Sequence, residues 1–180
     1  MPEFRRQNIR LPTEAYRGQR RYLLTLCFYK RRRFGADPRI ARWLADGIRK
    51  HSTACEFLVH AYSVMPDHVH IFAEGASAES NMVKFAEAFK QQTAVEFARR
   101  HGGELWQFKY YDHVLRRADS FDRVAWYVWM NPVRAGLCRA PADYPFSGAM
   151  TPGMQKLFRG SSAVEWLPPW KAKAKIERKK

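Results

Sequence analysis

Two runs of strand-forming residues with a very short turn between them constrain this fold more than any other feature. Residues 57–65 and 68–74 are rich in apolar side chains, and a Pro-Asp pair separates them. A turn this short joins neighbouring strands, so the sequence predicts a β-hairpin here. Side chains alternate faces along a strand, which places His68 and His70 on the same face.

The spacing of His68 and His70 is typical of a metal site. Neutral imidazole is the commonest protein metal ligand, and a His-apolar-His strand offers two nitrogens to one divalent ion. The alternative is a half-buried strand whose polar face carries two histidines without a metal. The tripeptide alone leaves both interpretations open.

Strands and helices alternate along the rest of the chain. Apolar periodicity, caps and turn residues predict strands at 21–29 and 105–115, and helices at 38–50, at 79–101 and from 120 to the bend at Pro132. This order is typical of an α+β sandwich of the split βαβ type. We expect a ferredoxin-like or RRM-like fold, with a mostly antiparallel sheet of four to five strands flanked by helices.

The charge balance favours a polyanionic partner. The chain has 32 Lys and Arg against 17 Asp and Glu, a formal net charge of +15. Nucleic acid is the leading candidate, because binding to phosphates releases counterions and so supplies affinity. An anionic membrane surface usually requires a basic amphipathic helix or a lipidation signal, and neither stands out.

The composition also bounds the organisation of the chain. At 180 residues it fits one domain, expected at 20–150, with a basic arm at 1–19 and a flexible basic tail at 151–180. Three widely spaced cysteines form no Cys-x-x-Cys pair, and no run of about 18 apolar residues occurs. We therefore expect a soluble cytoplasmic protein with no membrane partner.

A tyrosine and an asparagine late in the chain are candidates for the second half of a site. Tyr127 and Asn131 are four residues apart, so a helix presents them on one face. A positioned phenol can act as a nucleophile, and an amide oxygen can serve as a third metal ligand. The alternatives are that Tyr127 is a core aromatic and that Asn131 caps the turn beginning at Pro132.

Four segments in this order carry a family resemblance: MPDHVHIF, WQFKYYDHVLR, YVWMNPVRAGL and ADYPFSGA. Together they resemble the single-tyrosine transposases of the HUH endonuclease superfamily, and among these the REP-associated tyrosine transposases. The resemblance covers about residues 21–149. It implies that His68 and His70 bind the metal, Mg²⁺ or Mn²⁺, that Tyr127 is the nucleophile, and that Asn131 is the polar residue one turn later.

The resemblance also implies a reaction. The enzyme would cleave and rejoin single-stranded DNA next to hairpins such as REP-like palindromes, through a 5′-phosphotyrosine intermediate and a free 3′-hydroxyl. No water is consumed, so the step can be reversed with a new strand. In the domesticated branch the working form can be a monomer, which we favour over a homodimer.

Basic and aromatic side chains are the candidates for DNA contacts, although each arginine could also be an ordinary solvated charge. The basic candidates are Arg31, Arg32, Arg33, Lys90, Arg116, Arg117 and Arg134. Arg5, Arg6 and Arg10 of the arm are candidates for recognition of a short guide sequence. Tyr110 or Tyr111 could stack on bases, and only one of them can face DNA if the strand alternates.

Other function classes account for the sequence less well. Histidine-triad nucleotide hydrolases need a third histidine where Phe72 stands, and an RNA-binding module would carry a glycine-aromatic signature that is absent. A non-catalytic hairpin-DNA-binding protein is the remaining alternative. Retention of His68, His70 and Tyr127 argues for catalysis, but the sequence leaves this alternative open.

Overall fold

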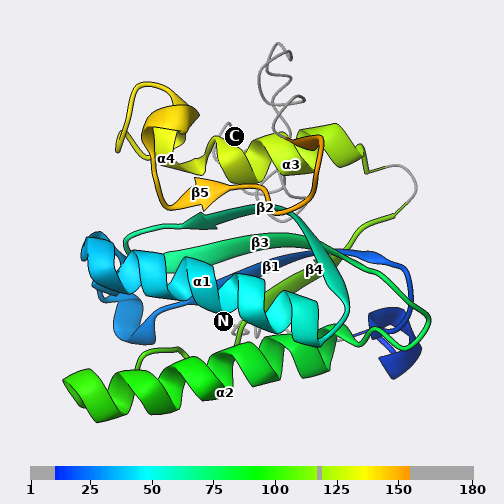
Figure 1. Ribbon diagram of the computed structural model, residues 1–180, viewed down its shortest axis with the longest axis horizontal. Helices are drawn as coiled ribbons and strands as arrows, with labels where there is room; N and C mark the ends of the chain where they lie inside the picture. The colour runs from blue at the N-terminus through cyan, green and yellow to red at the C-terminus, as the bar shows by residue number, and fades with distance from the viewer. Residues whose placement is uncertain (1–10, 117–118, 155–180) are drawn as a thin grey trace, which may run out of the picture.

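A five-stranded antiparallel sheet lies at the centre of the computed structural model, which describes residues 11–116 and 119–154 (Figure 1). Its strands are β1 (Arg21–Cys27), β2 (Phe57–Val64), β3 (His68–Gly75), β4 (Tyr111–Val114) and β5 (Ser147–Gly148). They are arranged in the order β4-β1-β3-β2-β5. The predicted α+β fold and the predicted hairpin of β2 and β3 are confirmed.

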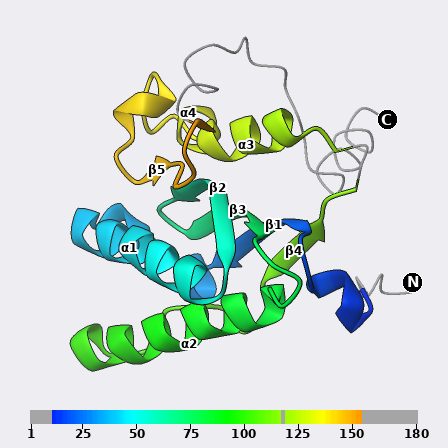
Figure 2. The same cartoon turned by 45° about the vertical axis from the view of Figure 1, so that its right-hand side comes forward.

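Helices cover both faces of the sheet. Helices α1 (Pro38–Ala54) and α2 (Met82–His101) lie on one side, whereas α3 (Phe121–Trp129) and the short α4 (Asn131–Arg134) lie on the other (Figures 1 and 2). Short 3-10 helices occur at Thr13–Tyr16, Tyr29–Arg31, Phe34–Ala36 and Pro141–Asp143. No helix within the two described ranges is long and apolar enough to cross a membrane.

Side-chain caps determine where the two long helices begin. The Asp37 carboxylate accepts a 2.8 Å hydrogen bond from the Arg39 amide, and Pro38 occupies the first turn of α1. Asn81 caps α2 by accepting from the Lys84 amide at 3.1 Å. The helix predicted from residue 79 therefore starts at Met82, because Asn81 satisfies its first turn.

The core has two parts, one on each face of the sheet. The larger part lies between the sheet and α1 and α2, and includes Leu24, Leu26, Leu44, Ile71 and Phe85. The smaller part lies beneath α3, and includes Leu23, Ala61, Phe72, Val124 and Val128. Because Phe72 faces α3 and strand side chains alternate, the side chains of His68 and His70 lie on the α3 face.

The predicted strand at 105–115 is wrong over its first half. Only β4, at the end of that range, pairs along β1, whereas Trp106 forms a single bridge to Phe28. The Lys90 ammonium donates to the carbonyl oxygens of Gln107 at 2.9 Å and Phe108 at 2.8 Å. Lys90 therefore binds carbonyl oxygens that would otherwise accept hydrogen bonds from a neighbouring strand, and the segment does not extend β4.

Parts of the expected arm and tail pack onto the domain. The side chain of Tyr16 is buried, and its hydroxyl donates to the Asp112 carboxylate at 2.7 Å. Near the other end, the Tyr144 hydroxyl donates to the Val64 carbonyl at 2.8 Å, and Met154 is buried beneath α3. Residues 11–19 and 151–154 therefore belong to the packed domain, and the rest of both segments lies outside the described residues.

The turn before His68 is packed against Gly35. The Gly35 amide donates to the Pro66 carbonyl at 3.0 Å, and a Cβ added at Gly35 would lie 2.3 Å from the Met65 carbonyl oxygen. A backbone oxygen cannot rotate away as a side chain does, so only glycine fits at this close approach. The contact holds the turn that leads into the histidine strand.

We expect Gly35→Ala to lower the free energy of unfolding by about 1–3 kcal/mol, because its methyl group displaces the turn backbone. Gly47→Ala in α1 is the control: its Cβ would lie 3.2 Å from the edge of the Phe89 ring, and alanine favours a helix. Urea unfolding followed by circular dichroism measures both variants. Equal losses in the two variants would contradict the role assigned to Gly35.

Candidate active site

His68 and His70 direct their rings toward a common point on the α3 face of β3. Their Nε2 atoms are 3.1 Å apart, and the ring planes make an angle of 84°. Two nitrogens about 2.1 Å from one ion and at right angles to each other lie about 3 Å apart. The imidazole pair therefore fits two adjacent coordination positions of an octahedral divalent cation.

Hydrogen bonds to the other ring nitrogens orient both histidines. Asp67 Oδ1 lies 2.6 Å from His68 Nδ1, and Thr25 Oγ1 lies 2.9 Å from His70 Nδ1. Burial alone raises the pKa of the Asp67 carboxyl, but the hydrogen bond and charge of His68 and the charge of Arg31, 3.1 Å away, lower it overall. The ionised carboxylate only accepts, so Nδ1 of a neutral His68 carries the hydrogen and Nε2 keeps its lone pair.

Tyr127 lies next to this pair although it belongs to α3. Its ring centroid is 5.8 Å from that of His70, with an angle of 66° between the planes. The side chain is only 1% exposed and packs with Leu23 and Phe72 in the core beneath α3. Tyr127 is therefore a core aromatic that also lies beside the histidines, and its role as a nucleophile stays a prediction.

The chain bends directly after α3 and brings two polar side chains back to Tyr127. Asn131 Nδ2 donates to the carbonyl oxygens of Tyr127 at 2.8 Å and Val128 at 3.2 Å. Arg134 donates to the same Tyr127 carbonyl at 2.9 Å, and its guanidinium carbon lies 4.1 Å from the Tyr127 ring centroid. The amide nitrogen of Asn131 is thus committed to the backbone, and only Oδ1 is suited to a cation.

The imidazoles offer part of a coordination sphere. Across residues 11–116 and 119–154, no group of three or more His, Cys, Asp and Glu side chains is arranged to hold a metal. The remaining positions of an ion at His68 and His70 would thus go to ligands of another kind. Amide, phosphate and water oxygens are the ligands that Mg²⁺ and Mn²⁺ prefer.

Two of the predicted DNA contacts lie at the site itself. Arg31 bonds Asp67, and its exposed neighbours Arg32 and Arg33 follow in the same turn. Arg134 is also exposed while its guanidinium covers the ring of the candidate nucleophile. The structure therefore brings positive charge to the end of β3 and to Tyr127, although the phosphate contacts stay predictions.

The other predicted basic contacts lie elsewhere. Lys90 belongs to α2, on the opposite face of the sheet, where its ammonium braces the backbone at Gln107 and Phe108. Arg116 is exposed just after β4, and its role stays a prediction. Arg5, Arg6, Arg10 and Arg117 lie outside the described residues.

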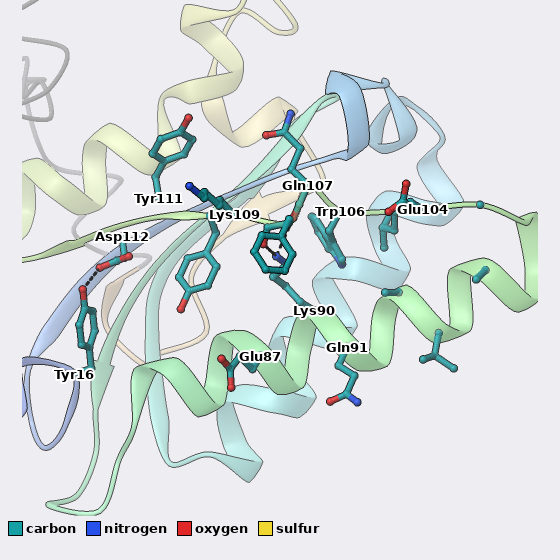
Figure 3. Close-up of a pocket in the computed structure, with 17 residues that line it drawn as sticks. Tyr16, Glu87, Lys90, Gln91, Glu104, Trp106, Gln107, Lys109, Tyr111 and Asp112 are labelled. Carbon is teal, nitrogen blue, oxygen red and sulfur yellow. Dashed lines mark hydrogen bonds between the residues drawn. The ribbon is translucent and has the colours of Figure 1, made fainter. Parts of the chain in front are cut away.

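The structure shows which of the paired tyrosines faces the site. Tyr110 is buried in the core between the sheet and α1 and α2. Tyr111 is 50% exposed and points away from α2 (Figure 3). Tyr111 pairs with Thr25 across β1, and Thr25 pairs with His70, so the three side chains lie in one row on one face. Sequence reasoning missed Thr25 as a partner of His70, because the pairing register between β1 and β3 has no local signal. It also missed Asp67 as a partner of His68, although Asp67 directly precedes His68 in the sequence and could have been found there.

Comparisons with known proteins identify relatives of this chain. The profile of the family described as "Transposase IS200 like" matches residues 19–131. The REP-associated tyrosine transposase of Escherichia coli (strain K12) is 23% identical over 110 residues, which are 61% of this chain. This chain spans about 62% of the length of that relative.

A solved structure supports the same fold. The REP-associated tyrosine transposase bound to a REP hairpin has a TM-score of 0.64 to this protein at 20% identity, and the match covers 93% of this chain and 92% of that one. The resemblance read from the four sequence motifs is confirmed by these matches. Because the family profile covers well over half of its length, this chain belongs to the IS200-like transposase family.

Proposed function

We propose that this protein cleaves and rejoins single-stranded DNA next to hairpins, through a covalent bond to Tyr127 and with a divalent cation at His68 and His70. The observation that carries the proposal is the 5.8 Å separation of the Tyr127 and His70 rings, which come from different elements. Membership of the transposase family supports the reaction class. The relative solved with a REP hairpin supports hairpin DNA as the substrate. We expect the protein to act as a monomer in the bacterial cytoplasm.

The proposed step conserves the energy of the phosphodiester bond. The Tyr127 hydroxyl oxygen attacks the phosphorus, and the bond from phosphorus to the 3′ oxygen of the preceding nucleotide breaks. The phenol loses its proton and the departing 3′ oxygen gains one, so no water is consumed. The 3′-hydroxyl of another strand can then attack the phosphotyrosine, which restores the phenol and joins the DNA.

The side chains around the histidines supply orientation and charge. His68 and His70 would hold Mg²⁺ or Mn²⁺, with Asn131 Oδ1 as a third ligand, and the cation would neutralise charge on the phosphate oxygens. Asp67 and Thr25 keep the imidazoles in the required orientation.

Arg134 would control access to the nucleophile. Tyr127 is 1% exposed and Arg134 lies over its ring, so an incoming phosphate meets the guanidinium first. Guanidinium groups bind phosphate through charge-assisted hydrogen bonds. We infer that Arg134 turns from the ring to the phosphate, which uncovers the hydroxyl and places positive charge beside the reacting group.

The burial of Tyr127 also favours a second candidate function, hairpin-DNA binding without cleavage. A hydroxyl enclosed in the core cannot attack until α3 or Arg134 moves. A protein that retained the fold and the basic surface could bind a hairpin without this movement. The covalent adduct described next separates the two functions.

We expect Tyr127→Phe to abolish covalent attachment to a labelled single-stranded hairpin in the presence of Mn²⁺, because only the attacking oxygen is removed. Denaturing gel electrophoresis detects the adduct, and fluorescence anisotropy should show hairpin affinity within about twofold of wild type. Chelator and His68→Ala should each remove the adduct from wild-type protein. An adduct that persists in the Phe variant would reject Tyr127, and wild-type protein that binds without any adduct would favour the non-catalytic function.

We expect Asp67→Asn to weaken Mn²⁺ binding by about 10–100-fold, because the ring of His68 loses the carboxylate that orients it. Isothermal titration calorimetry on the DNA-free protein measures this affinity independently of cleavage. Asp119→Asn is the matched control, since Asp119 lies 3.2 Å from His113 but not at the histidine pair. Equal Mn²⁺ affinity in all three proteins would contradict the role assigned to Asp67.

We expect Arg134→Ala to slow adduct formation by about 100-fold, because the phosphate loses a charged donor. Arg134→Lys should recover part of the rate, and Arg123→Ala, an exposed arginine on α3, should leave it unchanged. Single-turnover quench measurements give the rates. A faster reaction in Arg134→Ala would mean that Arg134 only shields the ring.

A further inference from the structure

A concave surface lies on the other side of β4 from the candidate active site. Helix α2, the segment 103–110 and β4 enclose a groove with a volume of about 1310 Å³ (Figure 3). The proposed reaction does not use this surface. Its chemistry differs from that of the basic site around Tyr127.

The groove displays an aromatic ring on a braced loop. Phe108 is 95% exposed, which is unusual for so large an apolar side chain. The Lys90 ammonium holds the carbonyl oxygens of Gln107 and Phe108, and Tyr110 next to them is buried. The backbone that carries the Phe108 ring is therefore anchored, and a partner that stacks on the ring has little loop ordering to achieve.

The charges inside the groove suit nucleobases better than phosphates. Glu87, Glu104 and Asp112 line it, with Lys90 and Lys109 as the cations. Three carboxylates against two ammonium groups disfavour a buried phosphate. Carboxylates accept hydrogen bonds from the amino groups of bases, and such edges are available in a single strand but paired in a duplex.

One residue, Tyr111, borders both the groove and the face that carries the candidate active site. Tyr111 lines the groove and also lies in the row with Thr25 and His70 on the opposite face. Since β4 is an edge strand, a flexible strand of DNA can pass around it. In Figure 3, Lys109 lies beside Tyr111 at β4. Its ammonium group is therefore available to a backbone phosphate of a strand that passes around this edge.

We propose that this groove binds unpaired bases of the single-stranded DNA that flanks the hairpin, with Phe108 as the stacking platform. The identity of the ligand rests on the proposed function. Bases enter the groove, and the phosphates stay outside near Lys109. Stacking of a base on an aromatic side chain tolerates any sequence, so the groove adds affinity for a single strand without reading its sequence.

The test compares two DNA ligands: a hairpin with a single-stranded extension and the same hairpin with a blunt end. Phe108→Ala should weaken binding of the extended hairpin by about tenfold and leave the blunt hairpin unchanged. Phe108→Trp should retain the wild-type affinity. Leu58→Ala is the matched control, because Leu58 is a half-exposed apolar residue on β2, away from the groove. Fluorescence anisotropy in chelator measures binding without cleavage.

Three outcomes would overturn the proposal. The first is a Phe108→Ala variant that loses equal affinity for both hairpins or loses no affinity for either. The second is photo-crosslinking of 5-iodouracil in the extension only to residues outside the groove. The third is a wild-type dimer that Phe108→Ala dissociates while DNA affinity is unchanged, which would assign the groove to a second copy. This binding test needs no cleavage, so the two proposals can fail separately. If wild-type protein forms no Tyr127 adduct but Phe108→Ala weakens binding of the extended hairpin, only the proposed function is rejected. If the adduct forms but Phe108→Ala leaves binding unchanged, only the groove proposal is rejected.

Discussion

The antiparallel pairing of β1 with β3 is the constraint on which the candidate site depends. In this register Thr25 is opposite His70, and Cys27 is opposite His68. Strand side chains alternate, so a slip of one residue would turn both imidazoles into the core under α1 and α2 and bring Val69 to the α3 face. The apolar requirement of the larger core therefore selects the orientation of the histidines.

The site also depends on the packing of α3 against the histidine face of the sheet, which Tyr127 itself makes. Tyr127 contributes to the core beneath α3 and lies beside His70 at the same time. Packing brings the phenol to the imidazoles, but it also encloses the hydroxyl, so reaction requires local movement. The chain turns at Met130, between α3 and α4, and Asn131 and Arg134 both bond the carbonyl of Tyr127, which makes the end of α3 the natural place for that movement.

Short-range patterns predicted the elements well where local signals decide them. The hairpin around the Pro-Asp turn, the capped start of α1 and the bend after α3 each depend on a few adjacent residues. The segment 105–115 was predicted as one strand because its aromatic residues favour β-structure. Lys90, distant in sequence, binds the backbone in its first half, and propensity cannot anticipate such a contact.

The sequence by itself determined that two imidazoles share one face of a strand, that the chain carries a large positive charge, and that a tyrosine and an asparagine follow late in the chain. These properties depend on spacing and composition alone. Only the tertiary structure decided that α3 covers the histidine face, that Thr25 and Asp67 orient the rings, and that Tyr111 instead of Tyr110 joins their row. Each of these depends on contacts between residues far apart in sequence or on the direction of a single side chain, and periodicity carries no information about either.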